Sequence, residues 1–183
     1  MIAIIQYNAG NIRSVENALH RLGCESILTD VPEQIAKADK VIFPGVGEAS
    51  SAMKYLHDKG LDEVIRSLQQ PVLGICLGLQ LLCAHSEEGD TRCLGVFEAG
   101  VRQFPPGGKA PHMGWNDFTR VGGRLFKDIE PHSDFYFVHG YYAEICPHTT
   151  AVCDYILPFS AALEKDNFYA VQFHPEKSAA AGE

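Results

Sequence analysis

The sequence around position 76 reads Leu73-Gly74-Ile75-Cys76-Leu77-Gly78-Leu79-Gln80. The apolar run before the cysteine predicts a short buried strand, and the leucines after it predict the start of a helix. Cys76 therefore lies at a strand-to-helix junction, with Gly74 two residues before it and Gly78 two residues after it. A turn this sharp leaves no room for side chains at the two flanking positions. This is the pattern of a nucleophile elbow with cysteine in place of serine.

An elbow at this position has a chemical consequence. The strained turn holds the cysteine sulfur out of the sheet and near the N-terminus of the following helix, where the helix dipole favours a thiolate. The alternative is a cysteine that is simply buried at the end of a strand, as free cysteines often are. Burial does not require glycine at both flanking positions, so the sequence favours a nucleophile.

The composition is that of one ordinary globular domain. The chain has 183 residues, of which 46% are hydrophobic and 21% charged, enough to bury a sizeable core. Its net charge of −8 argues against general binding to nucleic acids or to an anionic membrane surface. We therefore expect residues 1–183 to form a single domain.

The sequence indicates neither a targeting segment nor a metal site. No apolar run approaches the ~20 residues that a membrane span needs. The first five residues, Met1-Ile2-Ala3-Ile4-Ile5, lack the basic segment and cleavage site of a signal peptide and predict a strand. The six cysteines include no CxxC pair, so zinc-ligand spacing is absent. We expect a cytoplasmic protein with reduced thiols, no metal and no cofactor.

The first half of the chain alternates strands with helices. The apolar patterns predict strands at 1–7, 24–29, 40–43 and 72–75, and helical segments at 12–22, from 32 onward, at 49–59 and from there to 69. Asn11 is placed to cap the first helix and Gly23 to end it. The order βαβαβ requires a parallel sheet with right-handed crossovers.

Shorter strands follow after Ala84. The patterns predict them at 96–97, 101–104, 116–121, 135–138, 149–155 and 168–173. We expect an α/β protein with an open, mostly parallel sheet, flanking helices and a flavodoxin-like core, plus a smaller antiparallel portion. Open α/β sheets bind ligands at the carboxyl ends of their strands, so Asn8–Asn11, Gly45–Gly47 and Cys76 should lie on one rim.

A second chemical motif follows the last predicted strand, in the segment Gln172-Phe173-His174-Pro175-Glu176-Lys177-Ser178. A cysteine nucleophile needs a base to take its proton and a further group to orient that base. His174 and Glu176 suit these roles, because Pro175 makes a rigid turn from which both side chains can face the cleft. The competing bases are His85, His112 and His139. We favour His174 because its carboxylate partner shares this turn.

These groups predict acyl-transfer chemistry. The Cys76 thiolate would attack an amide carbonyl, and backbone N–H groups of Leu77 and of the Gly45–Gly47 loop would stabilise the tetrahedral oxyanion. His174 would protonate the leaving ammonia, and water would hydrolyse the thioester. The residues alone therefore support a cysteine hydrolase of the acyl-transfer type.

Five motifs carry a resemblance to a known family. They are Tyr7-Asn8-Ala9-Gly10-Asn11 followed by Arg13-Ser14-Val15, Pro44-Gly45-Val46-Gly47, Gly74 to Gln80, Pro111-His112-Met113-Gly114-Trp115-Asn116, and His174 to Ser178. Over essentially its whole length the chain resembles the class I, or triad, glutamine amidotransferases. Within that family it is similar to the glutaminase subunits of imidazole glycerol phosphate synthases, which act in histidine biosynthesis. Relatives in guanylate, anthranilate or carbamoyl phosphate synthesis share the cysteine elbow and the HPE turn but lack PHMGWN.

The resemblance implies roles for individual residues in hydrolysing glutamine to glutamate and ammonia. The implied catalytic triad is Cys76, His174 and Glu176, and the implied oxyanion-hole amides are those of Gly47 and Leu77. The residues implied to bind glutamine are Gln80, His139, Gly140 and Tyr141.

The resemblance also implies a partner. A TIM-barrel cyclase subunit would form a heterodimer with this chain and receive the ammonia. The cyclase would convert its ribulosyl-formimino ribonucleotide into imidazole glycerol phosphate and an aminoimidazole carboxamide ribonucleotide. The residues implied at this interface are Asn8, Asn11, Trp115, Tyr136 and Lys177. An aromatic residue at an interface is physically reasonable, although Trp115 taken alone would more simply be a core residue.

Three features depart from the family's pattern. Asn8 stands where the family more often has glycine, a change that a left-handed backbone tolerates. Gly140 replaces the usual serine or threonine after His139, which removes a hydroxyl from the wall of the glutamine site. The chain ends soon after Ser178, in Ala179-Ala180-Ala181-Gly182-Glu183, where the family continues into a helix rich in Leu and Phe. We therefore expect the C-terminal helix to be missing or truncated.

Three alternative functions are kept open. The first is the same glutaminase half-reaction in the service of a different synthase, against which PGVG and PHMGWN argue. The second is a flavodoxin-like binding module that holds phosphate in the 8–11 loop and makes no use of Cys76, although that loop lacks a run of Ser and Thr. The third is a regulatory protein with an inactive site, against which the intact Cys, His and Glu set argues.

Overall fold

The computed structural model describes residues 1–183, and its first half alternates strands and helices as predicted. The elements are β1 (Ile2–Ile5), α1 (Ile12–Arg21), β2 (Ser26–Thr29), α2 (Pro32–Lys37), β3 (Lys40–Phe43), α3 (Ala49–Asp58), α4 (Leu61–Ser67), β4 (Val72–Ile75) and α5 (Leu77–Leu82). Gly23 and Gly60 follow α1 and α3 with φ of 72° and 68°, a left-handed conformation that glycine adopts readily. These glycines explain why the predicted ends of the two helices agree with the structure.

The second half consists of short strands and one long strand. They are β5 (His85–Ser86), β6 (Thr91–Arg92), β7 (Gly100–Gln103), β8 (His112–Asn116), β9 (Arg120–Val121), β10 (Phe135–His139), β11 (Tyr141–Ala143), β12 (Thr149–Tyr155), β13 (Leu157–Lys165) and β14 (Phe168–Val171). The chain then forms the 3-10 helix η1 (Pro175–Lys177) and the four-residue helix α6 (Ala179–Gly182).

Two strand predictions are wrong. Residues 96–97 form no strand, because the Phe97 amide donates to the Leu82 carbonyl (3.0 Å) at the end of α5. The predicted strand 116–121 is divided between the end of β8 and β9. The Asn116 side chain accepts a hydrogen bond from the Asp117 amide (2.9 Å), and such a local bond competes with a sheet ladder.

Twelve strands form one mixed sheet, ordered β2-β1-β3-β4-β14-β13-β11-β7-β5-β6, with β12 against β13 and β9 against β12. Neighbouring strands run parallel from β2 to β14 and antiparallel from β14 to β7. Strands β8 and β10 form a separate antiparallel pair. The chain turns to opposite sides of β1 when it forms β2 and β3, and such a reversal creates a crevice at the carboxyl ends of the strands. The predicted α/β fold with an added antiparallel portion is confirmed.

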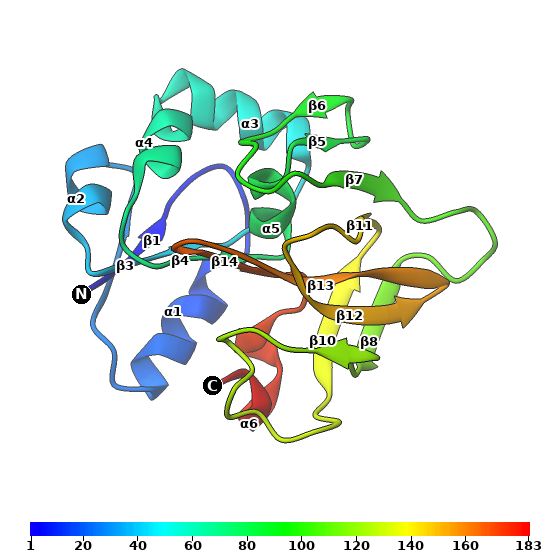
Figure 1. Cartoon of the computed structure of the whole chain (residues 1–183). Coiled ribbons are helices and arrows are strands. Elements are labelled where there is room, and N and C mark those ends of the chain that lie inside the picture. The colour runs from blue at the N-terminus through cyan, green and yellow to red at the C-terminus, as the bar shows by residue number, and fades with distance from the viewer.

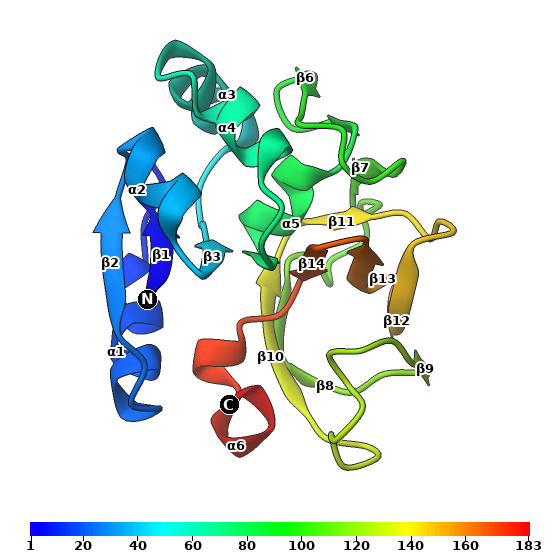
Figure 2. The ribbon, with the colours of Figure 1, turned by 60° about the vertical axis from the view of Figure 1, so that its left-hand side comes forward.

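The sheet is covered on both faces (Figures 1 and 2). Helices α2 to α5 lie on one face, where Leu56, Leu61 and Leu79 are fully buried. Helix α1, the β8–β10 pair and the C-terminal segment lie on the other, above a core that includes Phe135 and Phe137. Burying each such side chain stabilises the fold by about 1.5–3 kcal/mol. None of the helices in these layers combines the length and apolar character needed to cross a membrane.

Candidate active site

Cys76 occupies a strained turn between β4 and α5. Its backbone has φ 53° and ψ −108°, outside the regions that L-residues normally adopt. A Cβ atom on Gly78 would lie 1.9 Å from the Phe43 carbonyl oxygen. A Cβ atom on Gly74 would lie 2.7 Å from a Leu82 methyl carbon. Space therefore requires glycine at position 78 and is tight at position 74, as the elbow pattern predicts.

The two halves of the sheet bring Cys76 and His174 to neighbouring strand ends. Strand β14 pairs in parallel with β4, and Val171 is aligned with Ile75. The Cys76 amide donates to the Val171 carbonyl (2.9 Å), which fixes the start of the elbow against the end of β14. Cys76 and His174 each follow these paired ends within three residues, at the carboxyl rim of the sheet.

A cavity of about 250 Å³ opens at the sulfur of Cys76. Its walls include segments 46–47 and 138–141, together with Leu77 and Gln80. The loop at 8–11 is attached to the same rim, because the Gly10 amide donates to the Val46 carbonyl (3.1 Å). The predicted clustering of the three carboxyl-end segments is therefore found in the structure.

His174 and Glu176 form a buried pair. The Nδ1 atom of His174 lies 2.7 Å from Oε1 of Glu176, and the two side chains are only 2% and 4% exposed. In this pair, His174 donates the proton on Nδ1 to the Glu176 carboxylate. The other ring nitrogen of His174, Nε2, has no hydrogen-bond partner in the protein. Burial alone would lower the pKa of His174, but Cys76 and Glu176 together raise it to about 9. His174 therefore carries a proton at neutral pH.

The competing histidines have other environments. Burial lowers the pKa of His139 to about 3 and that of His112 to about 4, so both are weak bases. The Nδ1 atom of His139 donates to the Tyr141 carbonyl (2.7 Å). His85 is exposed and pairs with Asp90 (2.7 Å). His174 is the histidine whose surroundings suit a proton-transfer role beside Cys76.

The two amides predicted for the oxyanion hole differ in this structure. Gly47 has φ of 142° and its N–H has no partner, so this amide is free to donate. The Leu77 N–H instead donates to the Gly45 carbonyl (3.1 Å). A Cβ atom on Gly45 would lie 2.0 Å from the Tyr7 hydroxyl, so the packing of Tyr7 against this loop requires glycine at position 45. Only one of the two predicted amides is available in this conformation.

The residues predicted to bind glutamine lie together at the cavity. Gln80 donates from Nε2 to the Tyr141 carbonyl and to Gln172 Oε1, both at 3.1 Å, while its own Oε1 has no partner. No atom lies within 4 Å of a Cβ built on Gly140, so the absent hydroxyl leaves open space in this wall. Gln172 was not predicted to have a role, although it belongs to the segment that contains His174 and Glu176. A buried amide just before His174 was the available signal.

The residues predicted at a partner surface are partly exposed. Trp115 is 54% exposed and makes a T-shaped contact with Tyr136 at 5.8 Å, so it is not a core residue. Asn8 and Lys177 are exposed as well. Asn11, not Asn8, has the left-handed backbone (φ 67°). Asn11 stands at the N-cap position but accepts from the Ser14 hydroxyl (2.8 Å) and caps no backbone amide, contrary to the prediction.

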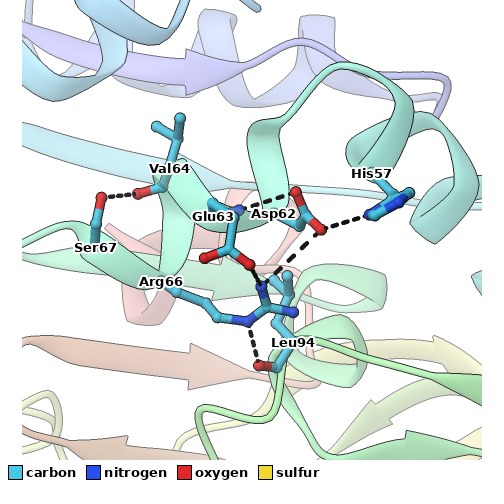
Figure 3. Close-up of polar contacts among 7 residues, drawn as sticks. All are labelled: His57, Asp62, Glu63, Val64, Arg66, Ser67 and Leu94. Atoms are coloured by element: carbon cyan, nitrogen blue, oxygen red, sulfur yellow. Dashed lines mark hydrogen bonds and ion pairs between the residues drawn. The ribbon is translucent and has the colours of Figure 1, made fainter.

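The largest hollow on the surface lies away from Cys76. It measures about 850 Å³ and lies between α3, α4 and the β6 segment. Part of its charged lining is paired (Figure 3): Arg66 contacts Glu63 at 2.6 Å and the Leu94 carbonyl at 2.9 Å, and Asp62 contacts His57 at 3.0 Å. These paired groups satisfy each other. The cysteine that lines this hollow, Cys93, is buried, has no left-handed backbone, and its sulfur lies 3.6 Å from the Thr91 carbonyl. The cavity at Cys76 is the candidate active site.

Comparison with known proteins gives the family. Residues 3–183 match the model of "Glutamine amidotransferase class-I". Imidazole glycerol phosphate synthase subunit HisH of Bacteroides thetaiotaomicron is 55% identical over 185 residues, which cover 100% of this chain and 94% of the relative. The subunit of the same name from Yersinia pseudotuberculosis is 48% identical over 184 residues, covering 99% of this chain and 94% of the relative.

Solved structures share the fold at lower sequence identity. A glutamine amidotransferase structure superposes with a TM-score of 0.73 at 19% identity, covering 100% of this chain and 94% of that one. A structure of PurLQS from Thermotoga maritima has a TM-score of 0.69 at 17% identity, covering 96% and 87%. The family match over residues 3–183 and the relative at 55% identity show that the chain belongs to the class I glutamine amidotransferase family.

Proposed function

We propose that this chain is the glutaminase subunit of an imidazole glycerol phosphate synthase, an enzyme of histidine biosynthesis. It would hydrolyse glutamine to glutamate and ammonia and deliver the ammonia to a cyclase subunit with a TIM-barrel fold. The observation that carries the proposal is the buried His174–Glu176 pair beside the strained Cys76, in a chain whose near relatives bear this synthase's name.

The proposed chemistry uses three side chains. The Cys76 sulfur attacks the carboxamide carbon of glutamine, the C–N bond breaks, and the nitrogen takes a proton from His174 Nε2 and leaves as ammonia. His174 then takes a proton from water, which attacks the thioester and releases glutamate. Glu176 holds the imidazole through Nδ1 and stabilises its charged form without changing its own protonation.

The oxyanion requires a change at one amide. The tetrahedral intermediate needs donors close to its oxygen, and Gly47 N–H is free to serve. The Leu77 N–H would have to exchange the Gly45 carbonyl for the oxyanion. A free chain in which this exchange has not occurred should be a slow glutaminase, and a partner that moves the 45–47 loop should stimulate it.

Glutamine recognition follows from the free groups of the cavity. Gln80 Oε1 is available to accept from the substrate's ammonium group, and the backbone of segment 139–141 forms the opposite wall. The exposed Trp115, with Tyr136 against it, would form the centre of the partner surface, because large aromatic side chains are common at interface centres. Asn8, Asn11 and Lys177 would complete that surface at the carboxyl rim.

The test is glutamate formation from glutamine, measured for the chain alone and for the chain mixed with a cyclase subunit and its nucleotide ligand. We expect slow hydrolysis alone and strong stimulation in the complex. The control is Cys76→Ala, which should retain the circular dichroism spectrum of the parent and release no ammonia in either condition. Surviving activity in Cys76→Ala would refute the nucleophile.

The other functions predict different results in the same assay. A glutaminase for a different synthase would respond to another partner and ignore the cyclase. A phosphate-binding module or an inactive regulator would release no glutamate in any mixture. Full activity of the chain alone would indicate an uncoupled glutaminase.

A further inference from the structure

Gln172 is a buried polar residue in contact with the sulfur of Cys76. Its side chain is fully buried, and its Nε2 atom lies 3.6 Å from Cys76 Sγ. Its backbone amide donates to the Ala161 carbonyl of β13 (2.8 Å), which fixes the position of the residue. A buried amide must find partners for its donors and its acceptor, so the direction in which Gln172 points is informative.

A backbone carbonyl determines this direction. The Tyr141 carbonyl can only accept, so Gln80 must present its NH2 group to it, at 3.1 Å. The same nitrogen donates its second proton to Gln172, also at 3.1 Å, so the atom of Gln172 that faces Gln80 must be the oxygen. The NH2 group of Gln172 therefore faces the sulfur. The opposite assignment would place two NH2 groups against each other.

The Tyr141 carbonyl is itself held by a directed chain of hydrogen bonds. His139 donates to it from Nδ1 (2.7 Å), so His139 Nε2 is an acceptor and takes its hydrogen bond from His112 Nδ1 (3.0 Å). His112 Nε2 in turn accepts from Asn116 Nδ2 (3.3 Å). Each member has one consistent role from Asn116 to the sulfur. The chain thus connects β8, the strand that carries Trp115, with the nucleophile.

The sulfur has different partners in its two protonation states. A neutral thiol can donate to the Val138 carbonyl, 3.8 Å from Sγ. A thiolate has no proton to donate and needs donors instead. The Gln172 NH2 group is such a donor, and it already lies 3.6 Å from the sulfur.

We propose that Gln172 is a positioning residue for Cys76, whose amide N–H stabilises the thiolate and keeps the sulfur aimed into the cavity. Gln80, held by the Tyr141 carbonyl, fixes the amide in this orientation. The proposal rests on the proposed glutaminase function for its role in turnover. The hydrogen bond to the sulfur can be tested without turnover.

The test compares the parent with Gln172→Glu and Gln172→Met. Glutamate keeps the size of Gln172 and an oxygen toward Gln80, but replaces the N–H that faces the sulfur. Methionine has a similar length and no donor. The measurement is the rate at which iodoacetamide alkylates Cys76 as a function of pH, followed by mass spectrometry of the peptide that contains it. Loss of a hydrogen bond to an ionised group should move the midpoint up by about one pH unit in Gln172→Met. The shift in Gln172→Glu should be at least as large, because a carboxylate there also repels the thiolate.

The controls separate this effect from damage to the fold. Phe168→Leu changes a buried side chain at the far end of the same strand, opposite Val72, and should leave the alkylation midpoint unchanged, even if it lowers stability. Each variant is checked by circular dichroism, and either of the two Gln172 variants that folds decides the question. An unchanged midpoint in a folded variant would overturn the proposal.

Turnover gives the second readout. In the complex with the cyclase, Gln172→Met should lower kcat about tenfold near pH 7 and recover part of the loss at higher pH, where the thiolate forms again. A purely structural residue would show no such recovery. If the parent complex hydrolysed no glutamine, the proposed function would fail, while the alkylation profile would still decide the role of Gln172.

Discussion

At the scale of single residues, His174 shows how neighbours outweigh burial. Removing an imidazole from water favours its neutral form, as it does for His112 and His139. His174 is equally buried, yet its pKa is raised to about 9, because Cys76 and Glu176 favour the charged ring. Burial thus lowers the pKa of His112 and His139, whereas neighbouring groups raise the pKa of His174. In the proposed chemistry, His174 is the histidine of these three that would hold a proton for the leaving ammonia.

This balance predicts the behaviour of Glu176→Gln. Glutamine retains an oxygen for the hydrogen bond to His174 Nδ1 but loses the negative charge, so the pKa of His174 should fall. His174 must be protonated to act as the acid, so kcat/KM should decline as pH rises through about 9 in the parent. The activity of the variant should decline at a lower pH and be reduced by up to about 10⁴-fold, short of complete loss.

The measurement is the pH profile of glutamate formation in the complex, with the parent as the reference. The sign is fixed by the raised pKa, since the proton is present below it and lost above it. If the variant had the same rate and the same pH profile as the parent, Glu176 would have no role beyond forming the turn after His174.

At the scale of elements, the β4–α5 junction is a part of the fold where close packing restricts which residues fit. Strand β3 approaches it so closely that position 78 cannot carry a Cβ atom, and position 74 is tightly packed against α5. The contact at Gly78 is with the backbone carbonyl of Phe43 in β3, which cannot move without disturbing the sheet. The geometry of the nucleophile therefore depends on the packing of α5 against β3.

We expect Gly78→Ala to destabilise the protein by about 1–3 kcal/mol or more, because overpacking against backbone cannot be relieved by a change of rotamer. Urea denaturation followed by circular dichroism measures the change. Gly122→Ala is the matched control, since the nearest atom to its new Cβ lies 3.9 Å away. It should change stability by no more than about 0.5 kcal/mol. Equal stability of the two variants would contradict the steric account of the elbow.

Elements with local signals were predictable from the sequence, and elements without them were not. The β4–α5 elbow was predicted because glycines and apolar runs define it within a few residues. Strand β13 (Leu157–Lys165) was not predicted, because Pro158 and the pair Ala161–Ala162 interrupt any β-type alternation. Its existence depends on pairing with β12 and β14, which no local pattern reports.

The same distinction applies within the site. The roles assigned to Cys76, His174 and Glu176 rested on motifs, and the structure places these residues side by side. Two other contacts depend on tertiary structure: the hydrogen bond from the Leu77 amide to the Gly45 carbonyl, and the contact between Gln172 and the sulfur of Cys76. Both required coordinates, because each depends on the distance between segments far apart in the chain.

At the scale of the whole molecule, β14 joins two architectures. It runs parallel to β4 on one side and antiparallel to β13 on the other, so the α/β half supplies Cys76 and the antiparallel half supplies most of the opposing wall. The β8–β10 pair stands beside this junction, and the His174 amide donates to the Tyr136 carbonyl of β10 (2.9 Å). The exposed aromatic face is thereby tied directly to the active site.

This arrangement predicts the effect of Trp115→Ala. The indole is 54% exposed, so its removal should leave the free energy of unfolding of the isolated chain nearly unchanged. Binding to the cyclase subunit should weaken by about 2 kcal/mol or more, close to thirtyfold in Kd, as for other aromatic residues at interface centres. Isothermal titration calorimetry with the cyclase subunit measures the change.

The control for Trp115→Ala is Leu22→Ala. Leu22 is 45% exposed and lies at the end of α1, where the chain enters β2 at the amino end of the sheet. This substitution should not alter the affinity. Equal affinities of the parent and Trp115→Ala would remove Trp115 from the partner surface.

The strained backbone at Cys76 serves the proposed reaction but lowers the stability of the folded protein. A residue held at φ 53° and ψ −108° costs the folded state roughly 1–3 kcal/mol, and glycine would adopt this conformation more easily. Selection for heat resistance alone would therefore favour loss of the sulfur. In a lineage that obtains the end product from its surroundings, replacing Cys76 with glycine would make the protein more stable. The presence of the cysteine therefore indicates that the reaction is still under selection. We expect Cys76 to be among the first residues to be replaced when that selection ends.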